Sequence, residues 1–349
     1  MTLRLIVAAL ALGAVPPLAA QVGTRQGVQV RLGGRVHPQY NSTSVTAEPR
    51  NEMLIRRARV TVDASWGWIS ARVEPDVGEG ELNVKDAWAA LDFGDALRVR
   101  FGQFKRPFDV FELTSSTEML VIERAGGIRG VNACAGPGGV CSFSRLTERL
   151  GYADRDIGVE LTGNAGGLDW SAAMTNGTGA NVEDENGAKS FTGRVSGRVG
   201  GNLAIAANVG AHDYVHPTGA ADEYAIALGG DLQYGEFERG LVLQIGFVTG
   251  DNWRVPVGTA GSASFMTAQA IVAWAIPMTG ERLVGIQPVA RLSWADPNSD
   301  AAGDSGMLLT PGLNFLFGHR NKLTVNLDVW VPNTGDTEYS VKVQQFFYF

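Results

Sequence analysis

The chain of 349 residues has few histidines and no residues arranged for catalysis. Its four histidines are scattered, and no serine stands in a Gly-x-Ser-x-Gly or comparable frame, which argues against a hydrolase. Asp213 close to His212 and His216 could ligate a metal, but polar loop residues explain this cluster more simply. The Gly-rich stretch at 130–139 lacks the Lys-Ser/Thr of a phosphate-binding loop. We therefore expect no enzyme, cofactor, metal or nucleic-acid partner.

Beyond residue 20 the chain also lacks any apolar run of the roughly 20 residues that a membrane-spanning helix needs. The first twenty residues differ from the rest. Arg4 is followed by an apolar stretch from Leu5 to Val15 and by small residues up to Ala20, which is typical of a cleaved secretory signal. A membrane anchor is the weaker alternative because the run is short. The sequence predicts a signal peptide at 1–20 and one mature domain at 21–349.

Only two cysteines are present, Cys134 and Cys141, at the ends of the Gly-rich stretch CAGPGGVC. Secreted chains fold in oxidising compartments, so the pair predicts a small loop-closing disulfide. Free thiols remain the alternative, and no histidine lies nearby to complete a metal site.

Short segments of period-two hydrophobicity, separated by turn residues, fill the mature chain, which has 45 Gly and 19% charged residues. An even number of strands lets both chain ends lie on one side of a barrel. The sixteen expected strands begin near residues 27, 53, 68, 84, 96, 155, 167, 191, 202, 223, 240, 265, 283, 306, 321 and 337.

The connections between these segments alternate in length. Brief ones follow every second strand, and longer polar ones follow the others. The brief connections lie at 65–68, 93–96, 164–167 and 200–202, and the longer ones include 41–52 and 177–190. Short periplasmic turns alternating with long extracellular loops are typical of a transmembrane antiparallel β-barrel, and a soluble sandwich has no reason to alternate in this way.

Each strand then has two faces. In the segment 321–331, Leu323, Val325 and Leu327 share one face, whereas Lys322 and Thr324 share the other. In a barrel the apolar face contacts lipid and the polar face contacts the water-filled lumen. Aromatic residues near strand ends, namely Trp66, Trp68, Phe93, Tyr234, Phe237, Trp294, Phe315 and Phe317, are expected at the lipid–water boundary.

The chain ends in an alternating segment that stops on Phe349. This ending resembles the C-terminal strand signature of bacterial outer-membrane barrels, whose terminal Phe is recognised by the barrel assembly machinery. The resemblance implies that the assembly machinery and outer-membrane lipid are partners of this chain.

Strand parity assigns twelve bases and six acids to the lumen, so a basic wall is expected inside an acidic protein of formal net charge -7. Such a wall favours anions, although full pairing of bases with acids is the alternative. The predicted pore-lining residues are Arg31, Arg35, Arg57, Arg59, Arg72, Arg98, Arg100, Arg194, Arg198 and Arg291, with Lys322 and Lys342 in the same phase. The inward acids are Asp63, Glu74, Asp76, Glu160, Asp231 and Asp328.

The connection from about 107 to 154 is the third long loop and is too long for a plain surface loop. We expect it to fold into the lumen and narrow the pore, with an extracellular flap as the alternative. Its predicted constriction residues, including the base that precedes it, are Lys105, Arg124, Arg129, Arg145 and Arg149.

At the entrance of this loop the sequence reads LRVRFGQFKRPFDVFELTSSTEMLVIERA. Gly102, Lys105, Pro107 and Phe108, with the Leu-Thr-Ser-Ser and Glu-Arg-Ala elements that follow, make it similar to the phosphate-selective porins of the porin O and P family. The likeness covers about residues 53–125. It implies a sixteen-stranded trimeric channel with the third loop folded inward, and it implies an anion preference. No lysine occurs between Lys105 and residue 188, so the family's lysine cluster for phosphate is not carried over.

The sequence thus predicts an outer-membrane porin for passive diffusion of small hydrophilic solutes, with a preference for phosphate or other small anions. A general porin of low selectivity or a structural outer-membrane barrel is the alternative, and an outer-membrane hydrolase is a more distant one.

Overall fold

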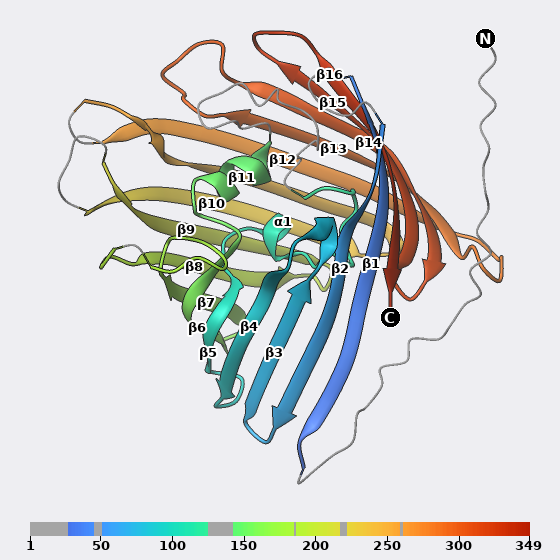
Figure 1. Ribbon diagram of the computed structural model, residues 1–349, viewed down its shortest axis with the longest axis horizontal. Helices are drawn as coiled ribbons and strands as arrows, with labels where there is room; N and C mark the ends of the chain where they lie inside the picture. The colour runs from blue at the N-terminus through green and yellow to red at the C-terminus, as the bar shows by residue number, and fades with distance from the viewer. Residues whose placement is uncertain (1–26, 45–50, 125–141, 185, 217–221, 259–260) are drawn as a thin grey trace.

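The structure, a computed structural model, describes residues 27–44, 51–124, 142–184, 186–216, 222–258 and 261–349. In these residues sixteen antiparallel strands form one closed barrel, in which β1 pairs with both β2 and β16 (Figure 1). The expected signal peptide, Arg129 and both cysteines lie outside the described residues.

The first eight strands are β1 (Gln29–Thr43), β2 (Asn51–Trp66), β3 (Ile69–Asp76), β4 (Asn83–Asp92), β5 (Arg98–Lys105), β6 (Arg155–Ala165), β7 (Leu168–Thr175) and β8 (Ser190–Val199). The second eight are β9 (Leu203–Val215), β10 (Asp222–Glu236), β11 (Arg239–Pro256), β12 (Ser262–Pro277), β13 (Gly285–Asp296), β14 (Gly306–Gly318), β15 (Asn321–Pro332) and β16 (Glu338–Tyr348). Every expected strand is therefore confirmed, and the largest difference is at β12, which begins at Ser262 where the sequence predicted 265.

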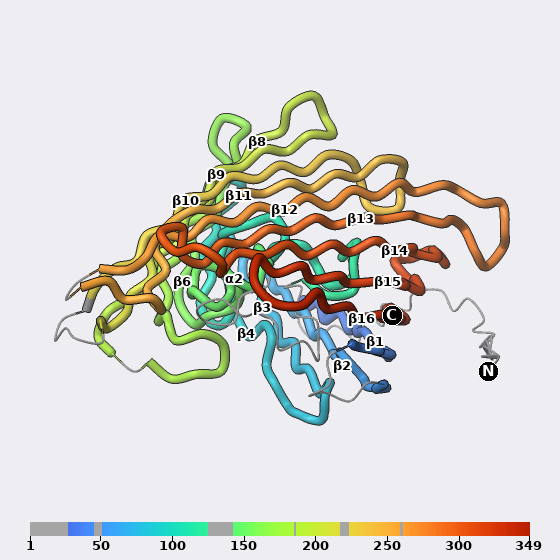
Figure 2. The backbone as a smooth tube through the Cα atoms, turned by 90° about the horizontal axis from the view of Figure 1, so that it is seen from above, coloured from blue at the N-terminus to red at the C-terminus, as the bar shows by residue number. Residues whose placement is uncertain are grey.

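The alternation of connections is also present. Short turns join β2 to β3, β6 to β7, β8 to β9, β10 to β11 and β14 to β15. The longest connection runs from 106 to 154, between β5 and β6. Figure 2 shows β9 to β15 running side by side along the wall. The alternation fails once, because the connection 278–284 after β12 is longer than 257–261 before it.

The wall is polar inside and apolar outside, the reverse of a soluble sandwich. In β15, Lys322, Thr324 and Asn326 are at most 1% exposed, whereas Leu327 and Val331 on the opposite face are exposed. In a closed barrel the buried face is the inner one, and the exposed apolar face suits hydrocarbon.

Several of the aromatic residues expected at the lipid–water boundary are exposed, and one of them points inward. Trp66, Trp68 and Phe93 are exposed near short turns, and the rings of Trp68 and Phe93 lie 5.6 Å apart. Phe237 does not share this position, because its ring lies 4.7 Å from the buried Lys322 ammonium and lines an inner cavity. Phe237 lies within the turn between β10 and β11, and its position near the strand ends did not show whether the side chain points into the barrel or toward the lipid.

Closure of the barrel depends on a small residue. Phe349 and Gly34 exchange backbone hydrogen bonds of 2.9 and 3.1 Å. A Cβ at Gly34 would lie 2.5 Å from the Phe349 ring and 2.7 Å from the Arg59 carbonyl oxygen, so only glycine permits this approach.

Two short α-helices, α1 (Val110–Leu113) and α2 (Phe143–Arg149), lie in the 106–154 connection, and a 3-10 turn, η1 (Gly78–Gly80), follows β3. Among the described residues no helix is both long enough and apolar enough to cross a membrane. α1 packs against β10 and β11, and α2 packs against β12 and β13. Phe111 and Phe143 meet edge to face at 5.0 Å, and Gly246 of the wall leaves room for Phe111, which would lie 2.7 Å from an added Cβ.

Candidate pore constriction

Three acids on β3 and β2 hold a chain of arginines along the wall formed by β1, β2 and β3. Glu74 accepts from Arg35 at 2.5 Å and from Arg59 at 3.2 Å, and Asp76 accepts from Arg59 Nε at 2.7 Å. Asp63 binds Arg72 through two hydrogen bonds of 2.7 and 3.0 Å. Bidentate pairing fixes the guanidinium planes as well as their positions.

A tryptophan organises the next group of arginines. The guanidinium carbons of Arg72, Arg98 and Arg100 lie 5.8, 5.3 and 5.4 Å from the Trp88 ring centre. Cations at this distance from an indole face are attracted by its quadrupole. Arg100 also pairs with Glu160, and Arg98 donates to Ser70 at 3.1 Å.

The other predicted pore-lining bases lie apart from this group. Arg194 pairs with Asp231 on β10 at 2.5 Å, and Arg291 shares Asp328 with Lys342 at 3.1 and 2.6 Å. Arg57 is buried with its guanidinium 3.6 Å from Glu123. Arg31 and Arg198 are exposed near the ends of β1 and β8.

The described start of the long connection, residues 106–124, is here called the loop arm. Its Glu112 side chain is 1% exposed and lies between two bases, with Lys105 Nζ and Arg124 Nη1 each 3.4 Å from one of its oxygens. Lys105 also donates to the Glu112 and Thr114 carbonyls, and Arg124 donates to the Phe111 and Thr114 carbonyls at 2.8 and 2.6 Å.

The loop arm binds strands that lie far from β5 around the barrel. On β1, Arg35 donates to Ser116 at 2.6 Å. On β15, Asn326 accepts from the Ile122 amide at 2.8 Å and Lys322 donates to the Met119 carbonyl. The carbonyls of Leu120 and Glu123 accept from Asn314 on β14 and Arg291 on β13, at 3.1 and 2.6 Å.

The described end of the connection, residues 142–154, binds the wall at β11 and β13. Phe143 donates its amide to Ser293 at 2.9 Å, and Tyr152 donates to the Asp251 carbonyl at 2.7 Å. Of the predicted constriction residues in this part, Arg149 contributes its carbonyl to Arg254 at 2.8 Å, and Arg145 lies on α2, where its amide donates to Ser142. Neither residue is among the described residues that line the same cavity as Arg72 and Arg100.

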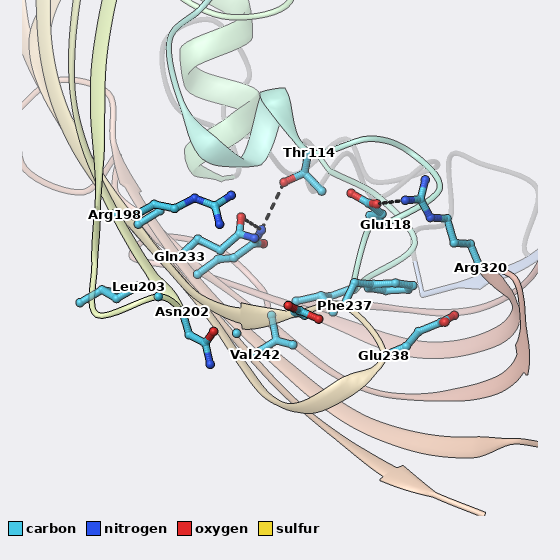
Figure 3. A pocket seen from close by; sticks show the side chains of 16 residues that line it. Thr114, Glu118, Arg198, Asn202, Leu203, Gln233, Phe237, Glu238, Val242 and Arg320 are labelled. Carbon is cyan, nitrogen blue, oxygen red and sulfur yellow. Dashed lines mark hydrogen bonds and ion pairs between the residues drawn. The ribbon is translucent and has the colours of Figure 1, made fainter. Parts of the chain in front are cut away.

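Two cavities flank the loop arm. Among the described residues, the basic cavity of about 240 Å³ is lined by seven bases and two acids, together with the uncharged loop-arm residues Leu113, Ser115 and Ser116. Its bases are Arg35, Arg59, Arg72, Arg100, Lys105, Arg124 and Arg155, and its acids are Glu74 and Asp86. The polar cavity, about 400 Å³, holds Glu118, Glu236 and Glu238 with Arg198 and Arg320 (Figure 3). The loop arm therefore separates a strongly basic space from a mixed one.

Burial and neighbouring charges determine the ionisation of the loop-arm acids. Burial alone would raise the pKa of Glu112, but Arg124 and Lys105 outweigh it and hold the pKa below its ordinary value. Burial acts against Glu123 in the same way, yet Arg56 and Arg57 lower its pKa to about 2. Within the described part of the chain no ion pair involves Asp109, and burial raises its pKa to about 7 while one of its oxygens caps α1. Glu112 is thus a charged group in the middle of the loop arm.

One of the four scattered histidines lies next to a hydroxyl group in the structure. Ser190 lies 3.2 Å from His212 Nδ1, so a histidine is within reach of a hydroxyl. However, Asp213 accepts directly from Ser190 at 2.5 Å and does not orient the imidazole, as the acid of a serine-hydrolase triad does. No group of three or more metal-ligating side chains occurs within the described ranges.

Sequence reasoning missed Trp88 and Arg155. Trp88 is two residues after Asp86, so the two side chains lie on the same face of β4. A large aromatic residue on this polar face could have been predicted to point into the lumen. Arg155 stands where the sixth strand was expected to begin, but it was not named as a pore-lining base; it begins β6, pairs with Asp86 at 2.8 Å and lines the basic cavity.

The chain was compared with known proteins. A search of curated sequences found no match. Among solved structures, the DcaP outer-membrane channel of Acinetobacter baumannii has a TM-score of 0.66 at 12% identity, over 94% of this chain and 100% of that chain. An anion-selective porin from Comamonas acidovorans has a TM-score of 0.63 at 15% identity, over 92% and 100%. OmpT of Vibrio cholerae lacking loop L8 scores 0.61 at 11% identity, over 93% and 100%.

At these identities the structures establish the barrel fold, and membership of a family rests on the sequence itself. The family profile named phosphate-selective porin O and P matches residues 30–217, which is more than half of the chain and includes the strands and the loop arm that line the basic cavity. The chain belongs to the phosphate-selective porin O and P family.

Proposed function

We propose that this outer-membrane porin lets small hydrophilic solutes diffuse passively and prefers anions, with phosphate among the candidates. The observation that carries the preference is the basic cavity, where seven bases and two acids line about 240 Å³ beside the loop arm. An anion in this space approaches cationic groups from several sides.

The acids that pair with these bases do not remove the effect. Among the described residues, the seven bases pair with six acids, namely Asp63, Glu74, Asp76, Asp86, Glu112 and Glu160. Only two of the six line the cavity, so the bases stand between most of the acids and a passing ion. Because Coulomb energy falls with distance, the nearer positive charges dominate.

The proposal includes a pore narrowed by the loop arm. Hydrogen bonds from one segment to β1, β13, β14 and β15 support a path across the lumen, and Figure 1 draws α1 among the surrounding strands. The ten predicted pore-lining arginines would form the wall, and Lys105 and Arg124 would border the narrow section. Arg129, Arg145 and Arg149 would act farther along the connection.

The remaining parts of the proposal rest on the sequence. Residues 1–20 would direct secretion, and Phe349 would be read by the barrel assembly machinery. A homotrimer is proposed from the family resemblance. The family is one of channels, and we propose no enzyme activity for this chain.

Reconstitution in a planar bilayer tests the function. The reversal potential across a KCl gradient should show anion selectivity, and added phosphate then tests for block. Block would support a phosphate-type channel, whereas anion selectivity without block would support a general anion-preferring porin. Cation selectivity would refute the anion preference, and a barrel without any conductance would refute the channel.

A further inference from the structure

Glu112 is an acid in the place where an anion channel least needs one. Its side chain is 1% exposed and does not line the basic cavity itself. It contacts Lys105 and Arg124, and both of these bases line the cavity. Neutral or apolar residues could fill the same space at lower desolvation cost, since a buried charge is expensive unless it is paired. A role in the arrangement of the loop arm accounts for its presence.

The contacts around Glu112 join three points of the chain. Lys105 ends β5, Glu112 lies on α1, and Arg124 is at the far end of the loop arm. Both bases also donate to the Thr114 carbonyl, so the two ends of the arm are bound to its middle. The donors of Lys105 and Arg124 are therefore directed at the arm itself, and this closes residues 105–124 into a compact loop.

We propose that Glu112 is the positioning residue that sets the width of the pore, by holding Lys105 and Arg124 against the loop arm. This inference rests on the proposed function, in which the arm narrows the lumen. It assigns Lys105 and Arg124 to the shape of the constriction, and it leaves Arg35, Arg59, Arg72, Arg100 and Arg155 as the bases that attract the anion.

A purely electrostatic role for Glu112 makes the opposite predictions. If the carboxylate only reduced the positive charge of the cavity, its removal would increase anion selectivity and leave the pore width unchanged. Removal of Lys105 would then reduce anion selectivity, again without a change of width. If Glu112 holds the arm, both removals should loosen the arm and widen the pore, although they change the net charge in opposite directions.

The test uses Glu112→Gln, Lys105→Met and the control Glu118→Gln in the full-length porin. Glu118 is an acid of the same arm, but it pairs with Arg320 at 2.8 Å and has no contact with Lys105 or Arg124. Its substitution makes the same change in charge as Glu112→Gln and leaves the three-point contact intact. Heat-modifiable migration on a gel checks that each barrel is folded.

The width of the pore is measured under conditions in which its charge has little effect. In 1 M KCl the Debye length is only about 3 Å, so single-channel conductance reports mainly on geometry. Liposome swelling with the uncharged sugars arabinose, sucrose and raffinose gives the size cut-off. We expect Glu112→Gln and Lys105→Met both to raise conductance and to lose discrimination against raffinose, whereas Glu118→Gln keeps the wild-type values.

An unchanged sugar cut-off in Glu112→Gln and Lys105→Met would overturn the inference, as would equal widening by Glu118→Gln. Should Glu112→Gln not fold, Lys105→Met decides by the same criteria. The proposed function is judged separately on the wild-type protein, because an anion-selective wild type with an unaltered Lys105→Met pore would refute only the role of Glu112.

Discussion

Neutralising Arg72 should lower the anion-to-cation permeability ratio about threefold, and neutralising its partner Asp63 should raise it by a similar factor. The pair is suited to this test because both side chains are 36% exposed and are joined by two hydrogen bonds. Arg72→Gln removes a positive charge from the lining of the basic cavity, and Asp63→Asn removes the negative charge beside it.

The magnitude follows from Coulomb's law. One charge about 7 Å from a passing ion contributes about 0.6 kcal/mol at a dielectric constant of about 80. At ~0.1 M salt the Debye length of about 10 Å reduces this to about 0.3 kcal/mol. Because the anion and the cation are affected with opposite sign, the difference between them is about 0.6 kcal/mol, which corresponds to about threefold in permeability ratio.

The assay is the reversal potential in a planar bilayer at low salt, repeated at 1 M KCl, where screening should abolish most of the effect. Half-exposed ion pairs contribute about 0–1 kcal/mol to stability, so both variants should fold. The double variant Arg72→Gln with Asp63→Asn restores the net charge and should return the ratio close to wild type. Shifts in the same direction for the two single variants would refute the assignment of this wall to the pore.

Two further predictions concern parts of the chain outside the cavity. The first uses a chain whose own cysteines are replaced by serine and a membrane-impermeant maleimide applied to intact cells. The reagent should label Glu183→Cys in the 177–190 loop and should not label Ala165→Cys beside the β6–β7 turn. The reverse pattern would show that the topology is inverted. In the natural chain, Cys134 and Cys141 should react with a maleimide only after reduction, and labelling without reductant would exclude the disulfide.

The strands could be predicted because lipid on one side and water on the other impose a strict period of two. In β15 the alternation of Leu323, Val325 and Leu327 with Lys322 and Thr324 is complete, and the structure buries the polar set. In such a pattern each side chain shows whether it faces lipid or water, so the ends of a strand can be predicted to within a few residues.

The contacts of the loop arm could not be predicted in this way. Glu112 was visible only as one acid among several in a long connection, because no periodic constraint acts on an irregular segment. Its pairing with Lys105 and Arg124 depends on how α1 turns the chain back on itself. Ser190 and His212 likewise come together only through the register of β8 with β9, which the sequence does not specify to the residue.

The sequence likewise does not show which charges of the lumen stand nearest to a passing solute. A count of inward bases and acids predicts an excess of positive charge, but selectivity depends on which charges stand nearest the solute. The structure binds acids such as Asp76 and Glu160 to arginines, while those arginines line the cavity and their acids do not. Each of these buried acids fixes a guanidinium in place and costs little of its attraction for an anion, whereas the half-exposed Asp63 faces the solute as openly as Arg72 does. Variants that remove one of the buried acids should therefore disturb the geometry of the basic wall more than its net charge.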